Sequence, residues 1–320
     1  MHPFSRISTV FAWSFLTLVL GCSDRPPDET HTTAAGASDG FPQSVKDSFG
    51  HSVTLPRQPT RIVSTAPTNT EILFAVGAGP QVIGVTTYCN YPAEAAQREK
   101  IGGFAPKSIS VERIVGLGPD LVLTTGRIQQ SLADSLRDVR LPVLSYDAQS
   151  LQEVIRNIRV IGQAVGRAEA ADVLATKLEQ RLARVRQRFA GLPFQQRPRV
   201  LLLISEDPLT AAGPKSFAGQ MLEVAGARNV FADVEQQFPH VSEEEILKRN
   251  PAAIVLYERG MGLPSREHLG KRPGWSQVDA FRNHRVLAID DDLLARAGPR
   301  LFDGLEQMAD LLHPQTLRKK

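Results

Sequence analysis

Cysteine is almost absent from this chain of 320 residues, which contains only Cys22 and Cys89. Two cysteines exclude a disulfide-rich scaffold, and they are too few to ligate a metal cluster. Apolar runs long enough to span a bilayer are also absent. Such a chain must be stabilised by its hydrophobic core, and about 300 residues can supply one.

Motifs of common catalytic and nucleotide-binding sites are missing as well. The sequence has no Walker A motif, no G-x-G-x-x-G after a strand and no H-E-x-x-H. The seven histidines are scattered, whereas a zinc or manganese site needs several ligands that converge on one ion. The net charge of +3 is small and the basic residues are dispersed, which argues against nucleic-acid binding. We therefore predict a protein that is not an enzyme, with no catalytic residues, bound metal or cofactor.

The N-terminus carries a sustained apolar run from Ile7 to Leu20. The run is too short to span a bilayer and has the length of a signal-peptide core. Gly21 and Cys22 follow, and this junction resembles the lipobox of bacterial lipoproteins, in which the cysteine is lipidated. We expect residues 1–21 to be a lipoprotein signal peptide. A plain signal peptide followed by an incidental cysteine is the alternative.

Lipid on Cys22 would anchor the protein to a bilayer without spanning it. It would also leave Cys89 without a disulfide partner. Residues 22–43 are rich in Pro, Thr, Ser, Asp and Gly, which is typical of a flexible tether. We therefore expect an exported, membrane-anchored lipoprotein that faces the periplasm or the cell exterior.

Apolar runs and helical patterns alternate along the rest of the chain, which indicates an α/β fold with mainly parallel sheets. After an opening hairpin at 45–55, the expected strands are 62–63, 82–85, 121–123, 143–144, 200–204, 229–231, 253–257 and 286–289. Residues 167–190 contain no Gly or Pro and predict a helix about 36 Å long. The expected domains are an N-terminal α/β lobe (44–164), a connecting helix (165–192) and a C-terminal α/β lobe (193–320). The binding domain as a whole would cover about 61–316.

An internal repeat favours two similarly built lobes. Ser110 stands nine residues before Pro119, and Ser242 stands nine residues before Pro251. In both segments the serine is placed to cap a helix, and an apolar strand follows the proline. The same capping serine, proline and strand in the same order indicate that one architecture occurs twice.

Several short segments occur in an order typical of one transport family. They are Arg61–Ser64, Asn69–Gly77, Gly84–Pro92, Ile101–Phe104, Glu112–Val115, Pro119–Val122, Gln220–Gly226, Val241–Glu245 and Arg296–Arg300. Over roughly residues 45–315 the chain resembles the periplasmic substrate-binding proteins of ABC importers for cobalamin and ferric siderophores, most closely the cobalamin-binding branch. The resemblance implies two α/β lobes joined by one long helix, with the ligand held in a cleft between them.

The resemblance also implies how the protein meets its permease. In the cobalamin-binding branch one surface glutamate from each lobe docks onto permease arginines, and the matching positions here are Glu71 and Glu223. Glu71 has a second interpretation, because its spacing from Thr68 is that of a capping box. Glu223 is late in its expected helix, and its alternative is an ordinary solvated residue.

The implied ligand pocket uses aromatic and basic residues. The candidates are Tyr88, Tyr91, Phe104, Arg127, Phe238, His240, Arg259 and Arg296. Aromatic rings would cover a flat macrocycle, and arginines would pair with anionic groups. Each aromatic residue has a core position as its alternative, and His240 that of a hydrogen-bonding loop residue. Arg296 and Arg300 have the alternative of holding the last helix in place.

We predict capture of a metal-chelate nutrient, namely a cobalamin-like corrinoid or a ferric siderophore or haem, by a monomeric protein that delivers it to an ABC permease. The alternative is a zinc- or manganese-type metal-ion binder of the same architecture. Cys89, beside Tyr88, is expected to be a small buried residue; a soft metal ligand is its other interpretation.

Overall fold

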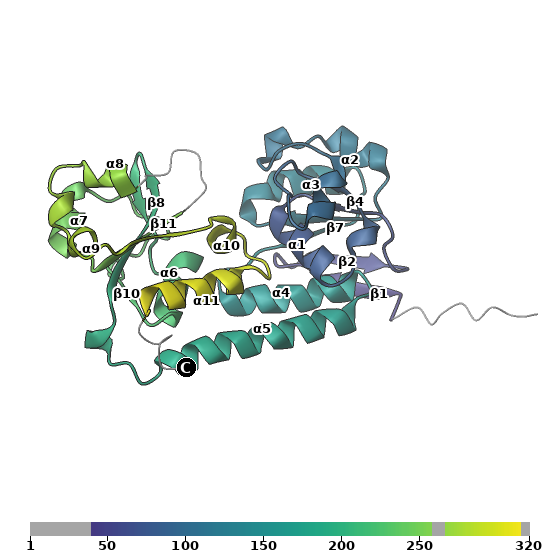
Figure 1. Ribbon diagram of the computed structural model, residues 1–320. Coiled ribbons are helices and arrows are strands. Elements are labelled where there is room, and N and C mark those ends of the chain that lie inside the picture. Colours follow the sequence, from purple (N-terminus) through teal and green to yellow (C-terminus); the bar gives the residue numbers. More distant parts are fainter. Residues whose placement is uncertain (1–39, 258–265, 315–320) are drawn as a thin grey trace, which may run out of the picture. The chain divides into compact units, whose positions relative to one another are not determined.

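The computed structural model describes residues 40–257 and 266–314. The expected signal peptide, Cys22, most of the expected tether and Arg259 lie outside these residues. In the described part of the chain, no helix is both long enough and apolar enough to cross a membrane. The described residues belong to one compact unit that contains two α/β lobes (Figure 1).

The N-terminal lobe is built around a parallel sheet in the order β5-β4-β3-β6-β7. Its strands are β3 (Ile62–Ser64), β4 (Val82–Val85), β5 (Glu99–Lys100), β6 (Leu121–Thr125) and β7 (Val143–Tyr146). Its helices are α1 (Pro67–Ala75), α2 (Val111–Leu117) and α3 (Gln130–Asp138), with 3-10 turns η1 (Gly79–Gln81), η2 (Ala93–Gln97), η3 (Pro106–Ser108) and η4 (Arg127–Gln129). The predicted hairpin is confirmed as β1 (Gln43–Lys46) paired antiparallel with β2 (Ser52–Leu55).

The C-terminal lobe contains a second sheet in the order β10-β8-β11-β12, with β9 antiparallel to β8. Its strands are β8 (Arg199–Glu206), β9 (Leu209–Ala211), β10 (Arg228–Asn229), β11 (Ala253–Tyr257) and β12 (Val286–Ile289). Its helices are α6 (Phe217–Val224), α7 (Glu243–Arg249), α8 (Arg266–Gly270), α9 (Asp279–Arg282), α10 (Asp292–Ala295) and α11 (Leu301–Leu312), with 3-10 turns η5 (Phe194–Gln196) and η6 (Trp275–Gln277). The predicted α/β fold with mainly parallel sheets is confirmed.

The two sheets share one topology, since β4-β3-β6-β7 corresponds in order to β10-β8-β11-β12. In this correspondence α2 and β6 match α7 and β11, which are the segments of the internal repeat. Ser110 and Ser242 each accept a hydrogen bond from the backbone N–H three residues on. Both helices end at a left-handed residue, Gly118 or Asn250, just before the proline. The repeat in the sequence is therefore a repeat of the fold.

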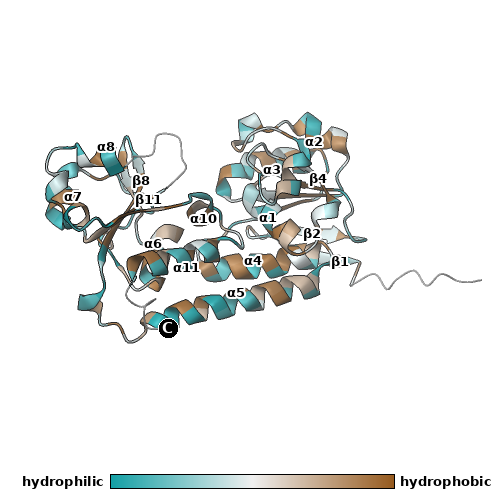
Figure 2. Cartoon of the chain, viewed as in Figure 1, coloured by the Kyte–Doolittle hydropathy of each residue, from teal (hydrophilic) through white to brown (hydrophobic). Residues whose placement is uncertain are grey.

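Two helices, α4 (Leu151–Ala164) and α5 (Ala168–Phe189), connect the lobes. The long helix predicted at 167–190 is confirmed as α5, whose 22 residues extend over about 33 Å. Helix α4 packs against α5 and against α1 of the N-terminal lobe, while α5 also packs against α6 and α11 of the C-terminal lobe. Apolar and hydrophilic residues alternate along both helices, as expected for helices with one buried face (Figure 2).

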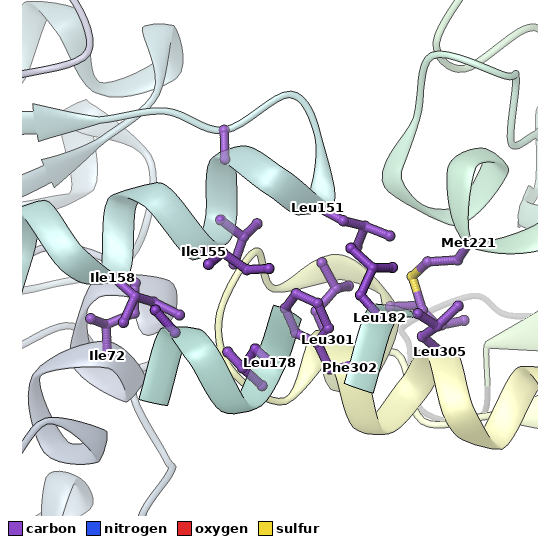
Figure 3. Close-up of a cluster of buried hydrophobic side chains, with 14 of the residues drawn as sticks. Ile72, Leu151, Ile155, Ile158, Leu178, Leu182, Met221, Leu301, Phe302 and Leu305 are labelled. Atoms are coloured by element: carbon purple, nitrogen blue, oxygen red, sulfur yellow. The ribbon is translucent and has the colours of Figure 1, made fainter. Parts of the chain in front are cut away.

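One apolar core runs through both lobes and these helices. Figure 3 shows Ile72 of α1 and Ile158 of α4 at one end of the cluster, and Met221 of α6 and Leu305 of α11 at the other. Phe302, which is fully buried, packs within it. Any change in the angle between the lobes must preserve or repack this shared core.

The alternative interpretation of Glu71, a capping box with Thr68, is wrong. Helix α1 begins at Pro67, its N-cap is Ala66, and no side chain caps it. Proline is favoured at the first helical position because its fixed φ suits the helix and its missing N–H would be unpaired there anyway. The helix therefore starts before Thr68, and the Glu71 carboxylate is engaged elsewhere.

Candidate functional site

A cavity of about 750 Å³ lies between the lobes, at the carboxyl ends of the strands of the N-terminal sheet. Ligands of open α/β sheets bind at this edge because the loops that leave the strands converge there. The segments after β3, β4, β6 and β7 supply Asn69, Thr87, Tyr88, Gly126, Asp147 and Ala148. The C-terminal lobe supplies Phe217 at the start of α6 and Asp292, Ala295, Arg296 and Ala297 at α10.

Three of the predicted ligand-binding residues line this cavity: Tyr88, Phe104 and Arg296. Tyr88 is 56% exposed, so its ring is available as a flat apolar surface. The structure thus brings together two aromatic residues and one arginine from the predicted set. Whether they touch a ligand remains a prediction.

The other predicted ligand residues in the described part of the chain are not among the residues that line the cavity, although Arg127 stands between two that are, Gly126 and Ile128. The Tyr91 ring lies under the Arg300 guanidinium, 4.0 Å from its carbon to the ring centroid. Arg127 lies over Phe49 instead. Phe238 is half exposed.

His240 matches the loop alternative that the sequence left open. Its Nδ1 lies 3.2 Å from the Thr210 hydroxyl, with which it forms a hydrogen bond. Its backbone bridges that of Thr210 as well. These contacts hold the loop after Pro239 against β9.

Sequence reasoning missed the polar residues of the N-terminal lobe that face the cavity. Asn69, Tyr146 and Asn157 are buried and Asp147 is partly exposed, and all four line the cavity. A signal was available, because Asn69 follows β3 while Tyr146 and Asp147 end β7. Polar residues at the carboxyl ends of adjacent parallel strands are brought to one edge of the sheet.

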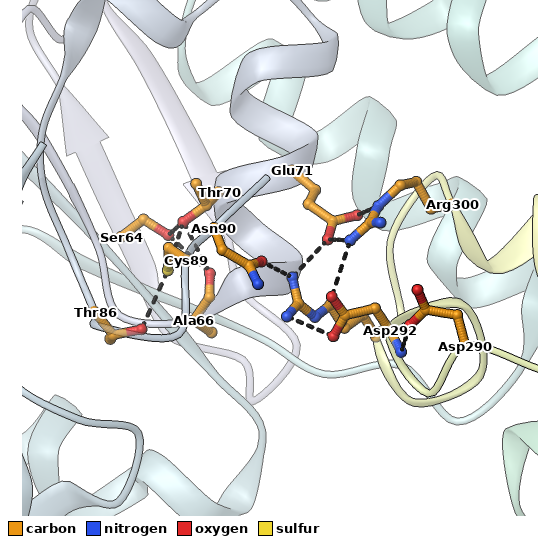
Figure 4. Close-up of polar contacts among 11 residues, drawn as sticks. Ser64, Ala66, Thr70, Glu71, Thr86, Cys89, Asn90, Asp290, Asp292 and Arg300 are labelled. Carbon is orange, nitrogen blue, oxygen red and sulfur yellow. Dashed lines mark hydrogen bonds and ion pairs between the residues drawn. The ribbon is translucent and has the colours of Figure 1, made fainter. Parts of the chain in front are cut away.

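A buried ion network crosses between the lobes beside the cavity (Figure 4). Glu71 on α1 is only 3% exposed. Its carboxylate accepts two hydrogen bonds from Arg300, at 3.0 Å from Nε and 2.6 Å from Nη2. Arg296 Nη1 donates a third to Glu71 at 3.1 Å and another to Asn90 at 2.8 Å. Asp292 completes the network, 2.5 Å from Arg296.

The network is close to electrically balanced. Two guanidinium groups, Arg296 and Arg300, face two carboxylates, Glu71 and Asp292. Burial lowers the pKa of Arg300, but its hydrogen bonds to Glu71 and the nearby negative charges outweigh burial and raise that pKa. Bidentate pairing of this kind is the strongest form of side-chain ion pair.

The surface position expected for Glu71 is therefore wrong. Its carboxylate is enclosed by arginines of the C-terminal lobe and is not presented to a partner. The alternative for Arg296 and Arg300, that they hold the last helix in place, agrees with these contacts. Glu223, by contrast, is exposed on α6, as a docking residue must be.

The metal-ion alternative is not favoured. Within residues 40–257 and 266–314, the one group of side chains that could hold an ion is Asp290, Asp291 and Asp292, and Asp292 is paired with Arg296. Cys89 is buried and lies 3.1 Å from the hydroxyls of Thr70 and Thr86. It does not line the cavity, which fits a small buried residue.

The charge of the cavity is low. Of the described lining residues only Asp147, Asp292 and Arg296 carry full charges, and the arginine is already paired with two carboxylates. The Asp147 carboxylate accepts from the Ala148 backbone N–H at 3.0 Å and from the Gln149 amide at 3.0 Å. Such a lining favours ligands that present an uncharged face to it.

Comparison with known proteins finds one family model and several related sequences. The family model for periplasmic binding proteins matches residues 62–293. An uncharacterised ABC transporter substrate-binding lipoprotein of Bacillus subtilis, YvrC, is 34% identical over 316 residues, which are 96% of this chain and 98% of the relative. The vitamin B12-binding protein of Pectobacterium carotovorum is 30% identical, over 79% of this chain and 88% of its own length.

Solved structures agree in fold. The vitamin B12-binding protein BtuF of Vibrio cholerae superposes with a TM-score of 0.70 at 27% identity, covering 81% of this chain and 98% of that protein. The haem-binding protein RhuT of Roseiflexus gives a TM-score of 0.71 at 28% identity, with 79% and 98% covered. Two relatives with different ligands thus share this two-lobe fold.

Proposed function

Because this chain belongs to the periplasmic binding protein family, we propose that it captures a corrinoid in the cavity between its lobes and delivers it to an ABC permease. The low charge of the described cavity lining is the observation that favours a corrinoid over the other metal chelates. A corrinoid presents a flat, largely uncharged macrocycle, whereas haem and many ferric siderophores carry carboxylates or other anionic groups that need unpaired cations. Relatives named as vitamin B12-binding proteins support this choice.

The cavity volume and lining suit a small-molecule site. About 750 Å³ is within the range of such sites, which combine apolar and aromatic walls with a few polar groups. Tyr88 and Phe104 offer rings from the N-terminal lobe, and Phe217 offers one from the C-terminal lobe. The proposed role requires no catalysis and no resident cofactor, because the metal chelate is the cargo.

A binding screen tests the proposal. The purified protein in detergent is titrated by calorimetry with cyanocobalamin, cobinamide, haem and a ferric siderophore, and its absorbance spectrum is recorded as purified. We expect micromolar or tighter binding of the two corrinoids and weaker binding of the anionic chelates. Failure to bind either corrinoid would contradict the proposal, and preference for haem would reassign the ligand.

We further propose that Cys22 carries lipid and tethers the binding domain to the membrane surface. The relative from Bacillus subtilis is named a lipoprotein, and Cys22 follows a signal-peptide-like run. Intact mass spectrometry should find a mature chain that begins at Cys22 with acyl groups attached. A mature chain that begins elsewhere or carries no lipid would leave a plain signal peptide.

Glu223 is proposed as the permease-facing charge of the C-terminal lobe. Exposed charges at an interface set the association rate and its salt dependence more than the affinity. Glu223→Lys is therefore expected to slow uptake a few-fold in cells while the ligand dissociation constant stays unchanged. The matched control is Glu244→Lys, which reverses an exposed charge in the first turn of α7. Equal uptake by both variants would remove Glu223 from the interface.

A further inference from the structure

Part of the cavity is lined by residues of α1, β7 and α4, and this part is called the polar pouch below. Its walls are Asn69 and Ile72 of α1, Tyr146 of β7, and Asn157 and Ile161 of α4, all of which line the cavity. Asn69 is 1% exposed and Tyr146 is 4% exposed. These two side chains are therefore almost completely buried where they line the cavity.

Two polar atoms in this pouch are left without a protein partner. The Asn69 Nδ2 group donates to the Thr124 carbonyl at 2.9 Å. That carbonyl can only accept, so it fixes the amide orientation and leaves Asn69 Oδ1 as an acceptor. Neither Asn69 Oδ1 nor the Tyr146 hydroxyl has a hydrogen-bond partner among residues 40–257 and 266–314.

Both groups are held in place rather than free to turn away. Tyr146 pairs in register with Thr125 across β6 and β7, and Asn69 is bonded to the adjacent Thr124. The Tyr146 hydroxyl remains a donor, because burial and the charge of Asp47 raise its pKa. A buried donor and a buried acceptor that remain unpaired destabilise a fold, so two such groups on residues that line a ligand cavity point to a ligand group.

We propose that this pouch binds a carboxamide side chain of the ligand. The amide carbonyl would accept from the Tyr146 hydroxyl, and the amide N–H would donate to Asn69 Oδ1. A carboxylate fits less well, since it has no N–H to offer Asn69 Oδ1. The inference rests on the proposed corrinoid function and deepens it, because a corrin ring carries carboxamides at its periphery.

Tyr146→Phe tests the proposal without disturbing other contacts, since the hydroxyl has no protein partner to lose. We expect the dissociation constant for cyanocobalamin to rise about tenfold, the usual effect of one lost hydrogen bond to a ligand. The melting temperature should stay the same or rise, because an unpaired buried hydroxyl is removed. The control is Tyr257→Phe, the same change at a tyrosine of β11 outside the cavity lining.

A second probe separates an amide site from a general polar one. Cobyrinic acid, in which carboxylates replace the peripheral amides, is expected to bind the unmodified protein at least tenfold more weakly than cobinamide does.

Equal affinity of Tyr146→Phe and the unmodified protein for cyanocobalamin would overturn the pouch proposal. It would indicate that water alone fills the pouch, and the proposed corrinoid function would be unaffected. Equal weakening by Tyr146→Phe and Tyr257→Phe would also overturn the pouch proposal. If the unmodified protein binds no corrinoid, the proposed function fails and the pouch proposal fails with it.

Discussion

Glu71→Ala is expected to lower the free energy of unfolding by about 3 kcal/mol. Removal of one partner from a buried ion pair leaves the other charge uncompensated, which costs about 3–5 kcal/mol. The Glu71 side chain is 2% exposed, but Arg296 and Arg300 keep 13% and 17% exposure, which places the effect at the lower end. Two arginines lose their common acceptor, and the contact between α1 and the start of α11 is lost with it.

Urea unfolding followed by circular dichroism measures this effect. Glu71→Gln should fall between the unmodified protein and Glu71→Ala, at about 2 kcal/mol, because the amide retains one acceptor oxygen for Arg300. The matched control is Glu267→Ala, which removes an exposed carboxylate of α8 that is paired with Lys271 and should change stability by less than about 0.5 kcal/mol. Equal effects at the two sites would show that the Glu71 network contributes no more than a surface pair.

The same variant has a second readout in ligand choice. Arg296 lines the cavity, and its positive charge is paired with the carboxylates of Glu71 and Asp292. Glu71→Gln removes one of these carboxylates, so the cavity wall becomes more positive. We expect the affinity for haem to rise relative to that for cyanocobalamin. An unchanged ratio would mean that Asp292 alone neutralises Arg296.

The sequence predicted those features whose signals are local. Apolar runs predicted most strands of both sheets, although β5 and β9 were missed and the strand expected at 229–231 is β10 at 228–229. The absence of Gly and Pro predicted α5, and Ser110 and Ser242 marked helix starts that the structure confirms. Each of these depends on residues within one or two turns of each other. The Ser…Pro repeat predicted two similar lobes for the same reason, since the same local helix–strand unit occurs once in each lobe.

The partners of Glu71 could not be predicted from local spacing. Its partners Arg296 and Arg300 lie 225 and 229 positions away in the chain, so no pattern near Glu71 indicates them. The spacing from Thr68 suggested a cap, but Pro67 fixed the helix start earlier. The resemblance identified Tyr88, Phe104 and Arg296 at the cavity. The strand ends indicate that Asn69 and Tyr146 lie at that edge of the sheet, but only the packing of α1, β7 and α4 leaves their polar atoms unpaired.

Phe302→Ala is expected to lower the free energy of unfolding by about 4 kcal/mol. Truncation of a fully buried phenylalanine removes its transfer free energy and leaves a cavity, which together cost about 3–5 kcal/mol. Phe302 on α11 belongs to the core that also contains Ile158 of α4, Leu178 of α5 and Met221 of α6. The surroundings come from several helices of one continuous core, so they can collapse only partly into the space.

The position of this core predicts the shape of the transition as well as its midpoint. Since α4 packs on the N-terminal lobe, α5 packs on the C-terminal lobe and the two helices pack on each other, Phe302→Ala should shift one cooperative transition to lower urea. It should not produce separate transitions for the two lobes. Phe194→Ala is the control; this ring is 63% exposed and packs on Arg228, so its loss should cost about 0.5 kcal/mol. Calorimetry with two resolved peaks in Phe302→Ala would contradict a shared core and would imply that each lobe folds independently. A single peak would mean that the lobes are coupled through α4, α5 and α11, so closure on a ligand has to proceed with that core intact.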